Sequence, residues 1–327
     1  MAALREGAER LIKRSFLAAS AYYTLTDCLA ELLEKTGRIK TRSGTIHSGR
    51  DLGSSLEYIE EVFGDYKRYS GVKAFHGRVV ELGPGDNSGV ALLFINDGCS
   101  GVDLVDRFYS IRDESQQSAI YRELAGKYPV IAGHCMDGTT VLPEAGFRGV
   151  QRHYGKSAAA EEFFRTHGPY DFIVSRAVME HLYDPVSALK DMAKSLAPGG
   201  MMLHKVDLRD HGMYSGYFHE QRFLQIPSAL FSRMTRASGR PNRVLVNRYR
   251  DTLEKCGLQV SIFVTRLASV GDIMPHCLYN DIAGEAREQA IASVRSVRDR
   301  FAGEFQALSD EDLSVTGFFL VAKKRID

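Results

Sequence analysis

Residues 79–89 read Val-Val-Glu-Leu-Gly-Pro-Gly-Asp-Asn-Ser-Gly, and this stretch decides the fold. An apolar run that suits a buried strand ends in a glycine-rich turn, and a helical pattern follows at 88–97. Glycine lets a backbone approach a ligand closely, and the first turn of a helix offers unpaired N–H groups. The stretch therefore predicts a ligand site at the carboxyl end of a strand in an α/β protein.

Short β-branched runs alternate with helical patterns along the rest of the chain, which indicates parallel strands joined by right-handed crossovers. The expected strands are 77–82, 101–105, 149–153, 171–175 and 201–206, followed by two late strands at 259–267 and 315–323. The expected helices are 88–97, 115–127, 158–166, 184–196 and 245–256. The prediction is a seven-stranded, mostly parallel sheet with helices on both faces.

The N-terminal region predicts helices at 4–36 and 54–68, separated by a loop at 37–53 that is rich in Gly, Ser and Thr. In the first helix Leu25, Leu29 and Leu32 recur at helical spacing, and we expect this face to pack into the core rather than touch a membrane. The expected organisation has three parts: a helical cap over 1–72, a catalytic domain over 73–327, and insertions within that domain at about 211–244 and, as a helical segment, at about 270–312.

Composition excludes several classes of protein. Net charge is +1, so no overall attraction to nucleic acid is expected. The five cysteines are scattered without a Cys-x-x-Cys pair, which favours a reducing compartment. Charges interrupt the N-terminal apolar run, and no long uncharged apolar stretch follows. We expect a cytoplasmic protein without a membrane or nucleic-acid partner, for which a homodimer is possible.

The glycine turn distinguishes between two classes of cofactor. Dinucleotide sites favour Gly-x-Gly-x-x-Gly, which brings a helix end onto a pyrophosphate. Here the run is Gly-Pro-Gly-Asp-Asn-Ser-Gly, and the carboxylates of Glu81 and Asp86 would repel phosphate and attract a cation. A nicotinamide oxidoreductase is therefore disfavoured, although it stays an alternative.

Several stretches resemble the motifs of class I, Rossmann-like methyltransferases that use S-adenosylmethionine (SAM). Residues 79–87 resemble the first motif, with Asn87 or Gly89 in place of its last glycine. Residues 170–182 resemble the fourth motif, and 196–200 resemble the Pro-Gly-Gly turn that follows it. The resemblance covers about 77–206 and implies SAM as cofactor. The residues it places at SAM are Glu81, Gly83, Pro84, Gly85, Asp86, Asn87, Asp106, Arg107, Phe108, Ser157, Ala158, Ser175 and Arg176.

Two acids compete for the ribose of SAM. Asp106 would end the strand that begins near 101, whereas Asp103 would lie in its middle. A carboxylate holds a ribose diol by accepting two hydrogen bonds, and the resemblance places that carboxylate at the strand end. We therefore prefer Asp106.

Histidines and acids gather after the fourth and fifth strands, where a methyl acceptor would bind. Histidine suits a general base, and a neighbouring carboxylate can orient it. The candidate catalytic residues are His211, then His204, with Asp207, Asp210 and His181. Some O-methyltransferases of ubiquinone biosynthesis bind a divalent ion through Glu-x-x-Glu-His. Here Ala177 replaces the first Glu before Glu180 and His181, so no metal is predicted.

Residues 231–250 contain six arginines and no acid. They suit recognition of an anionic acceptor, or a helix face that pairs with acids elsewhere. The layout also resembles, loosely, bacterial methyltransferases found with glycan-assembly enzymes. The favoured function is methyl transfer to a small molecule, most simply a hydroxyl of a sugar or natural-product intermediate. An RNA or protein methyltransferase and a SAM-binding protein without catalysis remain alternatives.

Overall fold

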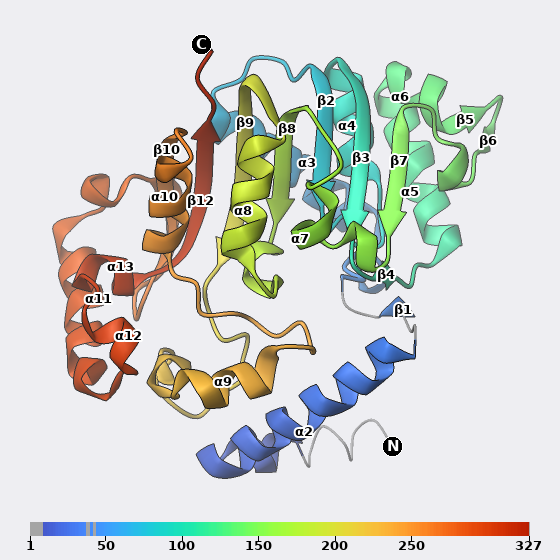
Figure 1. Cartoon of the computed structure of the whole chain (residues 1–327). Coiled ribbons are helices and arrows are strands. Elements are labelled where there is room, and N and C mark those ends of the chain that lie inside the picture. The colour runs from blue at the N-terminus through green and yellow to red at the C-terminus, as the bar shows by residue number, and fades with distance from the viewer. Residues whose placement is uncertain (1–8, 37–39, 42–43, 327) are drawn as a thin grey trace.

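The computed structural model describes residues 9–36, 40–41 and 44–326. Its centre is an eight-stranded sheet in the order β11-β10-β12-β9-β8-β2-β3-β7 (Figure 1). The strands are β2 (Gly77–Leu82), β3 (Cys99–Asp106), β7 (Val150–Tyr154), β8 (Tyr170–Arg176), β9 (Leu196–Asp207), β10 (Gln259–Leu267), β11 (Gly271–Cys277) and β12 (Val315–Lys323).

The five strands from β7 to β9 in this order are parallel to one another. The pairs β9–β12, β12–β10 and β10–β11 are antiparallel. The mostly parallel α/β fold is confirmed, with one strand more than the predicted seven. The additional strand is β11, which pairs only with β10 and contains Pro275. Proline cannot donate to a ladder, so a strand that carries it is confined to an edge and gives a weak sequence signal.

Each face of the sheet carries its own apolar core. One face packs against α7 (Ala160–Phe163), α8 (Pro185–Lys194) and α10 (Val246–Lys255). The other packs against α3 (Leu52–Ser70), α4 (Gly89–Asp97), α5 (Glu114–Lys127) and α6 (Pro129–Cys135). In Figure 1, α8 lies in front of the strands and α3 behind them. The predicted domain boundary at 72 remains a prediction, and α3 belongs to the layer that covers the sheet.

The insertion near 270–312 was predicted to be helical, but it begins with β11, and three α-helices follow beside β10 and β12. These are α11 (Gly284–Val297), α12 (Gly303–Gln306) and α13 (Asp310–Ser314). Phe301 and Phe305 join the same apolar core as α8 and α10, so the insertion is packed against the body.

Two helices lie beyond the carboxyl ends of the parallel strands (Figure 1). They are α2 (Phe16–Lys35) and α9 (Ser228–Thr235), and we call residues 211–240, which include α9, the lid. The hydroxyl of Tyr23 donates to the carbonyl oxygen of Met213 at 2.8 Å, and buried Asp27 accepts from Ser238 N at 2.9 Å. Polar contacts therefore fix the N-terminal helix to a segment far along the chain.

Of the predicted helix over 4–36, residues 9–13 and 16–35 are helical, with a break at residues 14–15, and residues 4–8 lie outside the described part. The expected burial of its leucine face is wrong. Leu25, Leu29 and Leu32 are 71%, 55% and 60% exposed. The buried face of α2 instead carries Ala19, Ser20, Tyr23 and Asp27, whose polar groups bond to the lid. Within the described residues, no helix combines the length and apolar character needed to cross a membrane.

Candidate functional site

The glycine turn between β2 and α4 is shaped by close contacts that only glycine permits. Gly83 and Gly85 have φ of +65° and +64°, in the left-handed region that favours glycine. A Cβ on Gly83 would lie 2.3 Å from Val178 Cγ2, and one on Gly85 would lie 2.5 Å from the carbonyl oxygen of Gly44. Both positions therefore require glycine for space as well as for conformation.

Residues 44–50, which we call the cover, lie directly on this turn. Asp86 N donates to Gly44 O at 3.2 Å, and the Asp86 carboxylate accepts from Ser48 N and Ser48 Oγ at 3.2 and 3.0 Å. Just before the cover, β1 (Lys40–Thr41) pairs with β4 (Tyr109–Ser110) beyond the end of β3. The sequence predicted only a loop here, so the cover is a part of the site that sequence reasoning missed.

A cleft between the cover and the turn holds a buried carboxylate. We call it the cofactor cleft, and it is lined by Gly44, Ile46, His47, Tyr58, Ile59, Val62, Glu81, Gly83, Pro84, Gly85, Asp86, Asn87, Val90, Arg176 and Ala177. Glu81 is 7% exposed, and its Oε2 has no hydrogen-bond partner within the described part of the chain. Burial raises the pKa of Glu81 to about 7, against the opposing effect of Arg152. Such a carboxylate suits a cationic ligand group.

Asp106 is the last residue of β3, as the sequence analysis preferred. Its Oδ1 accepts from Phe108 N at 2.9 Å, and burial raises its pKa to about 6. Asp103 differs, because Arg78, His153 and Tyr170 all bond to its carboxylate. Asp106 therefore has more capacity than Asp103 to accept bonds from a ligand.

The remaining predicted cofactor residues fall into different environments. Arg107 forms ion pairs with Glu34 and Glu161, at 3.0 and 3.3 Å. Phe108 is half-buried beside Asp106, Ser157 is exposed, and Ala158 is buried at the end of a short 3-10 turn. These contacts do not test whether the four residues bind the cofactor, so their role there stays a prediction.

Two further predicted cofactor residues end β8. Ser175 is fully buried and its Oγ lies 2.8 Å from His204 Nδ1, inside the sheet. Arg176 forms ion pairs with Asp65 and Glu61 of α3, both at 2.7 Å. Arg176 lines the cofactor cleft, whereas Ser175 has no surface there.

A second cleft adjoins the cofactor cleft, because Arg176 and Ala177 line both. It has a volume of about 280 Å³, and Lys205, Asp207 and Arg209 lie on its wall. Ala177 has φ of +54°, a left-handed conformation that is costly for a residue with a Cβ. Backbone strain of this kind is common at functional sites, which agrees with the position of Ala177 between the two clefts.

The structure brings His211 next to Asp207, which lines the second cleft. His211 Nε2 lies 3.5 Å from Asp207 Oδ2, and Arg209 Nε donates to Asp207 Oδ1 at 2.8 Å. Although burial acts to raise it, hydrogen bonds from Arg209 and His211 hold the pKa of Asp207 well below its usual range. An ionised Asp207 can orient His211 and stabilise its charged form.

Two other candidate catalytic residues lie where no substrate can reach them. His204 is fully buried between strands, and burial lowers its pKa to about 3, so it stays neutral. Asp210 is also fully buried, and its carboxylate accepts from the backbone N–H groups of residues 212, 214 and 215. Asp210 therefore shapes the turn, and Asp207 is the partner of His211.

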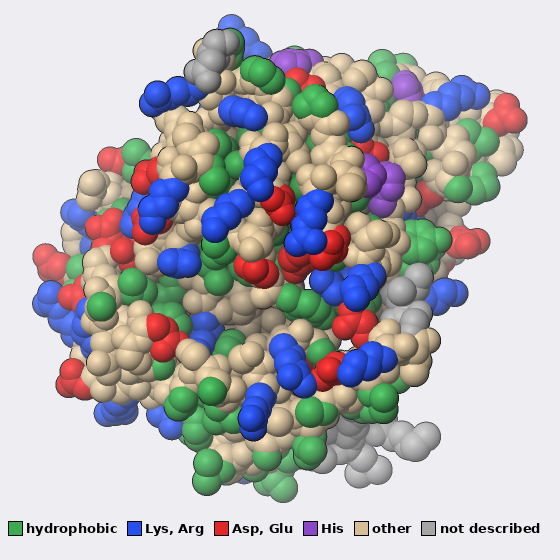
Figure 2. Space-filling view, viewed as in Figure 1, with side chains coloured by type: hydrophobic (Ala, Val, Ile, Leu, Met, Phe, Trp, Pro, Cys, Tyr) green, Lys and Arg blue, Asp and Glu red, His purple; other side chains and the backbone are tan. Residues whose placement is uncertain are grey.

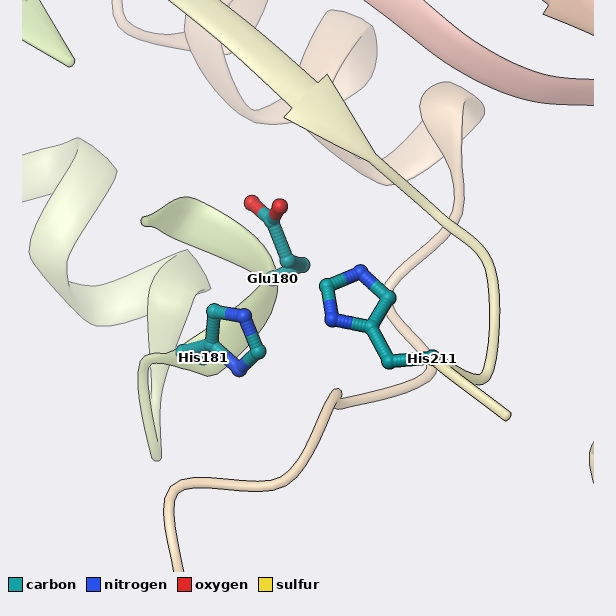
Figure 3. A group of neighbouring side chains, drawn as sticks. All are labelled: Glu180, His181 and His211. Atoms are coloured by element: carbon teal, nitrogen blue, oxygen red, sulfur yellow. The ribbon is translucent and has the colours of Figure 1, made fainter. Parts of the chain in front are cut away.

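Glu180, His181 and His211 form a compact cluster (Figure 3). Glu180 and His181 follow β8, and His211 follows β9. The imidazole centroids of the two histidines are 4.9 Å apart at 72°. Burial, and then His211, lower the pKa of His181 to about 4. The sequence placed these residues near one another but could not show that their side chains converge.

Three of the six arginines in the run 231–250 hold the lid in place. Arg236 pairs with Glu31 at 2.6 Å and Arg243 with Glu304 at 3.0 Å, while Arg240 donates to the carbonyl oxygens of residues 23 and 234. These three also line a cavity of about 590 Å³ between lid and body, which is visible as a hollow in Figure 2. The arrangement favours the structural interpretation of the run over recognition of an acceptor.

Comparison with known proteins decides the family. A family model described as "Methyltransferase domain" matches residues 55–259. The chain belongs to this methyltransferase family. Together with the α/β sheet and the glycine turn, this identifies a class I SAM-dependent methyltransferase, and SAM as its cofactor.

Individual relatives are distant. Ubiquinone biosynthesis O-methyltransferase of Caulobacter sp. (strain K31) is 34% identical over 64 residues, which are 20% of this chain and 25% of that protein. The chain thus matches about a quarter of the length of that curated relative.

Solved structures resemble the chain only loosely. Phosphoethanolamine N-methyltransferase 2 of Haemonchus contortus, in complex with SAM, is 16% identical with a TM-score of 0.42, over 81% of this chain and 52% of that one. YcgJ of Bacillus subtilis is 12% identical with a TM-score of 0.39, over 81% and 99%. Similarity at this level says nothing about the acceptor.

Proposed function

We propose that the protein transfers the methyl group of SAM to a hydroxyl of a small-molecule acceptor, a sugar or natural-product intermediate, with His211 as general base. One observation carries this proposal. Asp207, which lies 3.5 Å from His211, lines a cleft that shares Arg176 and Ala177 with the cofactor cleft. A base and a methyl donor placed in adjoining clefts can act on one bound acceptor.

The residues of the cofactor cleft, together with Asp106 at the end of the neighbouring strand β3, fit SAM. The unpartnered Oε2 of Glu81 would accept from the ammonium group of its methionine portion, and Asp106 would accept from the ribose hydroxyls. Gly83 and Gly85 let the backbone approach the ligand. SAM supplies an electrophilic methyl group on a sulfonium. Asp86 would act indirectly, since its carboxylate already binds Ser48 of the cover.

His211 would accept the proton of the acceptor hydroxyl, and Asp207 would stabilise the resulting imidazolium. Arg209 keeps Asp207 ionised for that purpose. The second cleft is lined by four cationic side chains and two carboxylates, and this excess of positive charge favours an acceptor that carries a negative charge. The cationic residues are Arg176, Lys205, Arg209 and Arg266, and the acidic ones are Asp207 and Asp272. His204 and Asp210 support the two strands and the turn without contacting the acceptor.

The test compares turnover with cofactor binding. Hydroxylated, anionic acceptors are screened with SAM, and S-adenosylhomocysteine (SAH) binding is measured by calorimetry beside NADH. We expect His211→Ala to lower turnover roughly 10²- to 10⁴-fold while SAH affinity stays within about twofold. His134→Ala serves as control, because His134 lies on α6, in another part of the fold, and its side chain bonds to the backbone carbonyl oxygen of Arg148. Unchanged turnover in His211→Ala would exclude the base.

A further inference from the structure

We infer that Glu180, His181 and His211 bind a divalent first-row transition-metal ion. One ligand atom from each side chain lies within 4.8 Å of the others. Glu180 and His181 come from the turn after β8, at Met179–His181, and His211 comes from the turn after β9. Figure 3 shows the two imidazole rings next to one another, with the Glu180 side chain beside them.

Glu180 is the strongest indication that something is bound here. It is 1% exposed, and its Oε2 has no hydrogen-bond partner among the described residues. Its Oε1 accepts only a long bond, 3.3 Å, from Asp207 N. A buried carboxylate oxygen without a donor is costly, and a cation beside it removes that cost.

Both histidines are held in the manner of metal ligands. His181 Nδ1 donates to the carbonyl oxygen of Gly239 at 2.7 Å, which leaves Nε2 with a free lone pair. His211 Nε2 lies 3.5 Å from Asp207, which leaves Nδ1 for the ion. Metal-bound histidines commonly use their second nitrogen to bond a carbonyl or a carboxylate, and both kinds of partner are present here.

The ligand set selects the kind of ion. Two imidazoles with one carboxylate suit Zn²⁺, Fe²⁺ or Co²⁺, whereas Mg²⁺ and Ca²⁺ prefer oxygen ligands. Ligands bonded to such an ion lie about 3.4 Å from one another, so small side-chain rotations would close the site. The His211 side chain is 32% exposed, which leaves a path for entry from solvent. Three protein ligands also leave a coordination position open.

This inference deepens the proposed function and rests on it for one consequence only. The open coordination position of the ion would take the acceptor hydroxyl, and the ion would lower the pKa of that hydroxyl. In the ion-loaded enzyme His211 would be a ligand, and the hydroxyl proton would pass to solvent water. Without the ion, His211 itself would accept that proton, as in the proposed function. Binding of the ion itself requires only the three side chains.

The experiment titrates Co²⁺ into the tag-free, chelator-treated full chain and follows visible absorption, with Zn²⁺ calorimetry in parallel. We expect one ion per chain and no competition from Mg²⁺ in excess. Glu180→Gln, His181→Ala and His211→Ala should each weaken affinity at least tenfold, and Asp207→Asn about 10- to 100-fold. His134→Ala, which removes a histidine with the same kind of carbonyl contact, should leave affinity unchanged. SAH binding verifies that each variant is folded.

The outcomes separate the two proposals. Absence of Co²⁺ binding in the wild type would overturn the metal site, as would equal affinity in His211→Ala and His134→Ala. SAH binding and turnover would then still support the proposed function. If Co²⁺ binds and depends on the three residues while no hydroxylated acceptor is methylated, the metal site stands and the proposed acceptor chemistry falls.

Discussion

Replacing Gly85 by alanine tests how the cover and the glycine turn depend on each other. The left-handed backbone at Gly85 costs an alanine roughly 1–2 kcal/mol. The new Cβ would also meet Gly44 O at 2.5 Å, too close to be accommodated without moving the cover. That movement breaks the bond from Asp86 N to Gly44 O, worth about 1 kcal/mol. We expect a total loss of roughly 2–3 kcal/mol.

Gly71→Ala is the matched control. Gly71 has φ of +68°, but a Cβ there would meet nothing within 4 Å, so only the backbone cost of roughly 1–2 kcal/mol applies. Urea denaturation gives the free energy of unfolding, and calorimetry gives the SAH affinity. Gly85→Ala should lower SAH affinity at least tenfold, and Gly71→Ala should not change it. Equal stability and equal SAH affinity in the two variants would refute a cover seated on the turn.

Three further predictions each concern the substitution of a single residue. Ala177→Gly should raise the free energy of unfolding by about 0.5–1 kcal/mol in urea denaturation, because glycine avoids the left-handed strain at φ +54°; no gain would mean an unstrained backbone. SAH affinity should rise between pH 6 and 8 as Glu81, with a pKa of about 7, ionises, and Glu81→Gln should remove that dependence. Because burial raises this pKa from 4.5 to about 7, the unliganded protein should also lose stability as pH rises from about 4.5 to about 7, unlike Glu81→Gln. Tyr23→Phe removes the bond to Met213 O and should cost about 1 kcal/mol in urea denaturation; an unchanged midpoint would show that this contact does not hold the lid.

Local sequence determined most of the fold. β2 has the predicted bounds, 77–82, because a short apolar run with turn signals at both ends has few alternatives. The face of α2 was predicted wrongly because its leucines have helical spacing, while its buried face uses Ser20, Tyr23 and Asp27. Their burial depends on partners on the lid, roughly two hundred residues away along the chain. Periodicity cannot reveal such partners.

The contacts of the site also divide into those that local sequence could predict and those that it could not. Asp207 and His211 are four residues apart, so their pairing could be predicted from the sequence, as could the acid at the end of β3. Long-range contacts could not be predicted: the cover on Gly85, and the pairing of Arg236 with Glu31. Asp210 and Asp207 are equally plausible partners for His211 in sequence. The structure distinguishes them, because the Asp210 carboxylate already accepts hydrogen bonds from the turn at 212–215.

The segment that follows β8 connects the cofactor turn, the candidate metal ligands and the lid. The left-handed turn at Ala177 places Val178 against Gly83, and Glu180 then follows with its carboxylate under the end of β9. Asn242 holds this segment from the other side, since its backbone N–H donates to Glu180 O at 2.6 Å and its Nδ2 to Met179 O at 2.9 Å. Strain at a functional site persists only where surrounding contacts enforce it. These bonds from Asn242 supply that enforcement, so displacement of residues just beyond the lid would alter the Glu180 position and the Val178–Gly83 contact together.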